Sequence, residues 1–191
     1  MLVQIGAAGS RISTMTATVP APLLSFLKQS GVALTLADAT SEDFPLLFVN
    51  DAFCKLTGYG PESVIGQNCR FLQPPEGAGP VRERIRAYLA NDANTTERFL
   101  LSNRRKDGTP FVNVLYMTKI FHGKTCVFVL GSQFDAARID GRNDTLYDSA
   151  LKDDVRQLSV IAGDTGFLMY GSIEALATST ALIAQSRGAN Q

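Results

Sequence analysis

The stretch that most constrains this chain is Gly66-Gln67-Asn68-Cys69-Arg70-Phe71-Leu72-Gln73, which brings a thiol, a cation and two amides close together. A thiol can act as a covalent nucleophile, and an arginine fork suits a phosphate or a carboxylate. Asn and Gln can pair with the polar edge of a planar ring, because each offers donors and an acceptor. A bare Cys-Arg pair is more often a turn with a buried structural cysteine, so the evidence of the remaining chain is needed.

Composition excludes several classes of protein. The chain has 191 residues, of which 45% are hydrophobic, and this suits one domain with extensions or at most two small domains. A formal net charge of zero provides no basic field for a nucleic acid or an anionic membrane. Three cysteines without metal-like spacing argue against a disulfide framework and a zinc site. We expect no signal peptide, no membrane span, no metal and a cytoplasmic location.

Hydrophobic patterns predict an ordered series of short elements. After a loose tail, Pro22 introduces an amphipathic helix, and strands are expected near 32–37 and 46–49. Asn50 and Gly58 bracket a short helix, Pro61 opens a further helical turn, and 80–91 form a longer helix. Three strands follow near 95–103, 111–121 and 125–134, separated by turns at Asp107-Gly108 and His122-Gly123.

Alternation along the last three strands places carboxamides on an apolar face. The face is expected to carry Phe99, Leu101 and Asn103, then Asn113, Leu115 and Met117, then Val127, Val129, Gly131 and Gln133. Buried amides need partners, so this face fits a flat heteroaromatic ring with polar edges better than it fits a plain core. The opposite face is too apolar for water and needs a cover. It is expected to include Cys126, which we interpret as a packing residue.

The octapeptide closely resembles the GxNCRFLQ signature of LOV photosensor domains, the flavin-binding branch of the PAS family. The order of elements over about residues 31–135 is also that of a PAS domain. The resemblance implies an α+β fold with a five-stranded antiparallel sheet, short helices on one face, and N- and C-terminal helical extensions. The corresponding domains are 1–30 as tail and cap helix, 31–135 as the LOV domain, and 136–191 as a helical extension without an effector domain.

The same resemblance implies a blue-light photoreceptor, rather than an enzyme, that binds FMN. In LOV domains the cysteine, here Cys69, forms a reversible adduct with flavin C4a. The carboxamides that match those holding the ring are Asn103, Asn113 and Gln133, and Gln133 is the expected signal relay. One arginine beside the cysteine and one on the following helix hold the phosphate, which matches Arg70 and Arg86. Arg82 lies one turn before Arg86 and could share that role. Asn68, Gln73 and Leu115 complete the expected cofactor-binding set.

Three positions depart from the family pattern: Gln67 replaces a common Arg or Lys, Ala37 a common Thr, and Leu115 a Phe that plant members often have. The tail is expected to form two helices, the second beginning near Phe167 or Ser172. Residues 135–191 carry eight acidic and five basic side chains, a net of about −3, which opposes a DNA-binding interpretation. We therefore expect a homodimer formed through the helical extensions and the outer sheet face, with an unknown downstream protein partner.

Two other functions remain open at this point. The domain could be a PAS module for constitutive dimerisation or for a different ligand. A flavin redox enzyme is a weaker hypothesis, because the chain has no nicotinamide-binding glycine fingerprint and no second catalytic constellation.

Overall fold

The computed structural model describes residues 18–136 and the pair 167–168. In chain order the elements are α1 (Ala21–Gln29), β1 (Ala33–Asp38), β2 (Leu46–Val49), α2 (Asp51–Thr57), η1 (Pro61–Ser63), η2 (Cys69–Leu72), α3 (Val81–Ala90), β3 (Thr96–Arg104), β4 (Pro110–His122), β5 (Thr125–Asp135) and β6 (Phe167–Leu168). The expected N-terminal tail and almost all of the expected C-terminal helices lie outside the described residues. Among the described residues, no helix is long and apolar enough to cross a bilayer.

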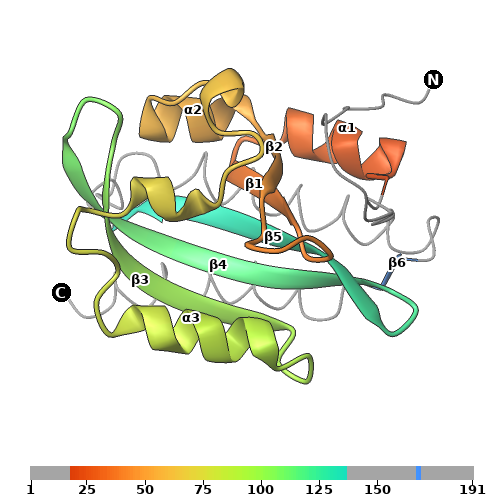
Figure 1. Ribbon diagram of the computed structural model, residues 1–191. Coiled ribbons are helices and arrows are strands. Elements are labelled where there is room, and N and C mark those ends of the chain that lie inside the picture. The colour runs from red at the N-terminus through yellow and green to blue at the C-terminus, as the bar shows by residue number, and fades with distance from the viewer. Residues whose placement is uncertain (1–17, 137–166, 169–191) are drawn as a thin grey trace, which may run out of the picture.

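The sheet confirms the expected five antiparallel strands. Their spatial order is β2-β1-β5-β4-β3, with η2 and α3 in front of the sheet in the view of Figure 1. The two-residue strand β6 adds to β4, where Phe121 pairs with Leu168 and His122 pairs with Phe167. The prediction of a helix that begins at Phe167 is therefore wrong, because Phe167 and Leu168 are extended and pair with the end of β4.

The short helix α2 forms where capping chemistry predicts it. The Asn50 side chain accepts a hydrogen bond from Phe53 N, and Gly58 ends the helix in the left-handed region at φ 78°. The Asn50 amide also donates to the carbonyls of Leu27, Ser30 and Val32, and so joins the end of α1 to the start of α2. This second role keeps a buried amide fully bonded.

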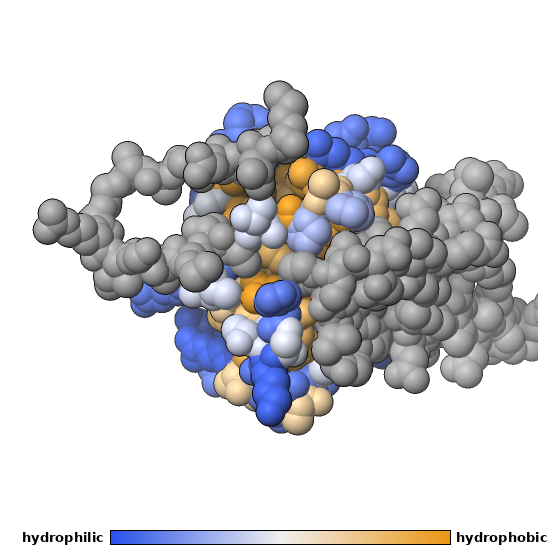
Figure 2. All heavy atoms as spheres, turned by 90° about the vertical axis from the view of Figure 1, so that its right-hand side faces the viewer, coloured by the Kyte–Doolittle hydropathy of each residue, from blue (hydrophilic) through white to orange (hydrophobic). Residues whose placement is uncertain are grey.

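Helix α1 covers the outer face of the sheet over β1 and β5. Its Leu23, Phe26 and Leu27 are buried against Leu36 and Phe128. Seen from the side of the β4–β5 hairpin, apolar side chains lie in a band between hydrophilic ones above and below (Figure 2). The inner face carries two further clusters: one is built on α2, η2, β1 and β2, and the other lies between α3 and β3.

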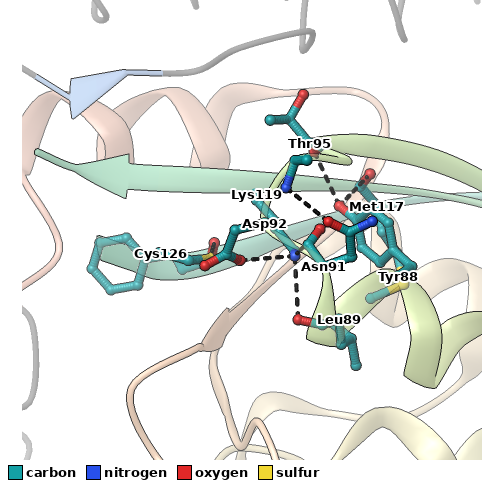
Figure 3. Close-up of polar contacts among 10 residues, drawn as sticks. Tyr88, Leu89, Asn91, Asp92, Thr95, Met117, Lys119 and Cys126 are labelled. Atoms are coloured by element: carbon teal, nitrogen blue, oxygen red, sulfur yellow. Dashed lines mark hydrogen bonds and ion pairs between the residues drawn. The ribbon is translucent and has the colours of Figure 1, made fainter. Parts of the chain in front are cut away.

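A β-bulge in the β4–β5 pair reverses the predicted faces of two side chains on β5. The β4–β5 register shifts between Ile120 and Phe121, after which Phe121 pairs with Cys126. Val127, expected on the inner face, instead belongs to the outer cluster. Cys126, expected on the outer face, lies beside Asp92 on the side of α3 (Figure 3). The predicted alternation of faces fails here because the bulge adds one unpaired residue to β5, and the side chains before it change face.

Helix α3 is held against the sheet by a buried lysine. Lys119 Nζ donates to the carbonyls of Leu89 (3.2 Å) and Asn91 (3.0 Å) and pairs with Asp92 (3.0 Å) (Figure 3). Its side chain is only 1% exposed. These bonds satisfy carbonyls at the end of the helix and place a positive charge at its negative pole. The inner surface of α3 is thereby fixed above β3 and β4.

Candidate functional site

A cavity lies between the inner face of the sheet and the elements η2 and α3. It encloses about 740 Å³ of space, counting its open mouth. Its walls are mostly apolar, with Leu46 and Leu72 on one side and Ile85, Leu115 and Met117 on the other. Polar groups converge on it from β3, β4, β5 and η2, and this combination is typical of a small-molecule site.

Cys69 presents its thiol to this cavity from the first turn of η2. The turn is capped by Asn68, whose Oδ1 accepts a hydrogen bond from Arg70 N at 3.0 Å. Burial raises the pKa of the Cys69 thiol to about 12, while a contact with the Gln133 side chain acts in the opposite direction. The thiol is consequently neutral at physiological pH.

Three carboxamides meet on the cavity floor, as the sequence predicted. Asn113 Nδ2 donates to Asn103 Oδ1 at 2.9 Å and to Gln133 Oε1 at 3.0 Å. All three side chains are buried. Within residues 18–136, neither Asn113 Oδ1 nor Gln133 Nε2 has a hydrogen-bond partner. An orphaned buried polar atom costs about 1–3 kcal/mol, so the floor offers one acceptor and one donor to a ligand.

The floor also has a flat place at Gly131. An added Cβ there would meet Thr35 Oγ1 at 2.6 Å and Leu115 Cδ1 at 3.4 Å. Only a glycine lets Thr35 approach the strand this closely, which keeps the floor level. Gly131 was expected on this face, whereas the contribution of Thr35 from β1 was missed. The pairing of β1 with β5 brings Thr35 opposite Gly131, and no local pattern indicates that pairing.

The cationic residues separate into two groups. Of the three arginines expected at the phosphate, Arg70 lines the cavity, together with the neutral Asn68, Cys69 and Gln73. Arg82 and Arg86 are exposed and lie outside the part of the cavity wall that the described residues form. Arg86 pairs instead with Glu83 at 3.0 Å. The assignment of Arg82 and Arg86 to a phosphate thus remains a prediction.

Sequence reasoning also missed the contribution of the loop between β1 and β2 to the cavity. Asp43 and Phe44 have positive φ values of 69° and 51°, and Phe44 lines the cavity. A non-glycine residue in this region is uncommon, and a phenylalanine especially so. The segment gives no hydrophobic periodicity from which its position could have been found.

Comparison with known proteins identifies this arrangement. The family model described as PAS domain matches residues 31–136. The chain belongs to the PAS domain family. It is 35% identical over 117 residues to the Blue-light-activated histidine kinase 1 of Erythrobacter litoralis (strain HTCC2594), covering 61% of this chain and 32% of that protein. It is also 35% identical over 113 residues to a blue-light photoreceptor of Listeria monocytogenes, covering 59% of this chain and 44% of the relative.

Solved structures place this PAS domain within the LOV group. The crystal structure of the Rhodobacter sphaeroides LOV protein superposes with a TM-score of 0.66 at 27% identity, covering 87% of this chain and 94% of that one. The expected LOV resemblance and PAS/LOV fold are confirmed. The chain spans about a third of the histidine kinase and less than half of the Listeria photoreceptor. The activities of those whole proteins are therefore properties of the relatives.

Proposed function

We propose that this LOV protein is a blue-light receptor that binds FMN in the cavity and uses Cys69 as the residue that bonds reversibly to it. The observation that carries the proposal is that two buried atoms, Asn113 Oδ1 and Gln133 Nε2, have no hydrogen-bond partner among the described residues and belong to an apolar cavity that also holds a neutral thiol. The dimethylbenzene side of a flavin is apolar, and its opposite edge carries donors and acceptors. The residues present fit this group.

Each part of the cavity has a role in holding the cofactor. Asn103, Asn113 and Gln133 bind the polar edge of the ring, and Leu115 packs against its plane. Asn68 and Gln73 lie on the side of Cys69, and Arg70 is the guanidinium positioned for the phosphate. Arg82 and Arg86 reach this phosphate only if their side chains swing toward the mouth. We choose FMN over FAD because the chain from Cys69 to α3 contains no long insertion that could house an adenine.

The chemistry requires orientation and a dry site more than a reactive thiolate. A bound flavin would supply the light absorption and an electrophilic ring carbon, and Cys69 would supply the sulfur and the proton for a bond that reverses in the dark. The raised pKa keeps Cys69 protonated, so the thiol carries the proton that this addition needs. The capped turn of η2 holds the sulfur at the cavity wall.

Gln133 is the proposed relay because, among the described residues, only the Oε1 atom of its amide has a hydrogen-bond partner. In the structure, Asn113 Nδ2 donates to Gln133 Oε1 at 3.0 Å. Rotating the Gln133 amide by half a turn would present Oε1 to the cavity and place Nε2 against Asn113 Nδ2. Two donors cannot face each other, so Asn113 must also turn. Gln133 lies two residues before the end of β5, and the signal proceeds from there to altered helical or dimer contacts.

One spectroscopic experiment separates the three functions. We expect purified protein to be yellow, to bleach reversibly under blue light, and to lose the long-lived bleached state in Cys69→Ser. Cys54→Ser is the matched control, since Cys54 is half-buried on α2 outside the described cavity lining. A flavin-bound Cys69→Ser protein that still forms the long-lived state would contradict the proposal. A colourless protein would favour a dimerisation module, and steady turnover with an electron donor would favour an enzyme.

A further inference from the structure

Arg70, the guanidinium at the cavity, is already engaged by an acidic side chain. Its Nη1 donates to Asp43 Oδ2 at 2.9 Å and its Nη2 donates to Oδ1 at 2.5 Å. This is the paired geometry in which arginine also holds two oxygens of a phosphate. Both side chains are more than half exposed, at 57% and 53%, so solvent ions and ligands can reach the pair.

The loop that carries Asp43 is fastened to the cysteine turn at a second point. Asn68 Nδ2 donates to the Asp43 backbone carbonyl at 2.5 Å. Asp43 and Phe44 are both left-handed, and Phe44 reaches the cavity wall that Arg70 shares. Such backbone conformations persist only where surrounding contacts enforce them. These contacts hold the backbone of Asp43 beside the cysteine turn, within reach of Arg70.

We propose that Asp43 occupies the phosphate position on Arg70 and thereby determines how strongly this protein prefers a phosphorylated flavin to an unphosphorylated one. The inference rests on the proposed function and specifies a residue that the resemblance does not include. Binding of FMN exchanges one anion for another on the same guanidinium, and the displaced carboxylate then lies beside a phosphate of like charge. Riboflavin has no phosphate and leaves the Asp43–Arg70 pair intact.

The test titrates flavin-free protein with FMN and, separately, with riboflavin, following flavin fluorescence. An exposed ion pair is weak, so we expect Asp43→Asn to bind FMN about fivefold more tightly, with riboflavin affinity unchanged. Asparagine suits this position because it tolerates the left-handed region and retains the backbone carbonyl that Asn68 binds. Glu42→Gln is the matched control, since it removes one exposed negative charge from the neighbouring residue.

A double-mutant cycle shows whether the effect passes through Arg70. In an Arg70→Gln background, Asp43→Asn should raise FMN affinity less than it does in the native protein, because the competition for Arg70 is absent and only the repulsion between Asp43 and the phosphate remains. Unchanged riboflavin affinity also shows that the Asp43→Asn protein folds. Unchanged or weaker FMN binding by Asp43→Asn overturns the inference, as does an equal change for both flavins, and both results leave the proposed function standing. If the native protein binds neither flavin, the proposed function and this inference fail together.

Discussion

At the scale of single residues, the Cys69 thiol determines how the protein should respond to pH. Burial raises its pKa from a usual 9.0 to about 12. The unfolded state therefore loses this proton first, so the contribution of Cys69 to stability is complete below about pH 9 and is lost as the pH rises from 9 toward 12. We expect the urea midpoint to fall more between pH 8 and pH 10.5 for the native protein than for Cys69→Ala. Parallel falls in the two proteins would contradict this.

The sequence could predict which residues surround the cavity better than it could predict their bonding. Cys69, Asn113 and Gln133 were found because a motif and strand alternation give their positions directly. The absence of partners for Asn113 Oδ1 and Gln133 Nε2 within the described part of the chain depends on cross-strand register. The engagement of Arg70 by Asp43 depends on an irregular loop, and such loops carry no periodic signal.

At the scale of elements, α3 depends on the lysine beneath it. Lys119→Met keeps the length of the buried stem but removes the bonds to the Leu89 and Asn91 carbonyls. We expect the free energy of unfolding to fall by about 1–3 kcal/mol, the usual cost of leaving buried polar groups unpaired. Urea denaturation measures it, with Lys124→Met in the exposed β4–β5 turn as the control. Equal stability of the two variants would show that α3 is held by apolar packing alone.

A second, largely buried cation, Arg105, joins the end of β5 to α2. Arg105 Nη2 pairs with Asp135 at 2.5 Å, Nη1 donates to the Leu56 carbonyl, and the guanidinium lies 4.5 Å from the Phe111 ring centre. The paired side chains are 16% and 6% exposed. We expect Asp135→Asn to lower the free energy of unfolding by about 3 kcal/mol, because it leaves a largely buried cation uncompensated. A loss in thermal denaturation no greater than that of Asp107→Asn, in the exposed β3–β4 turn, would disprove this role.

Elements were easier to predict than their irregularities. Caps at Asn50 and Gly58, and turns at Gly108 and Gly123, follow from local chemistry, and these elements lie where expected. The bulge near Val127 and the pairing of β6 with β4 depend on distant parts of the chain. Local sequence also gave no sign of the ion pair of Arg105, because its partner Asp135 is 30 residues away.

At the scale of the whole molecule, the described helices cover the outer sheet face unevenly. Helix α1 packs over β1 and β5, whereas Leu100 on β3 and Val112 on β4 remain 53% and 47% exposed. The register pairs Leu100 with Val114 and Ser102 with Val112, so the two exposed side chains are diagonal neighbours on one face. Adjacent exposed apolar side chains favour association, and we propose that a second copy of the chain packs here.

This proposal predicts a dimer that depends on Leu100. Burying a leucine contributes about 1.5–3 kcal/mol, so Leu100→Lys should weaken dimerisation at least about tenfold in light scattering over a concentration series. Thr109→Lys, at the exposed β3–β4 turn, adds the same charge and should leave the dimer unchanged. Gln133→Leu should retain the dark dimer but lose any change of size under blue light, since its amide begins the proposed relay. A Leu100→Lys protein that dimerises normally would move the interface to another part of the chain.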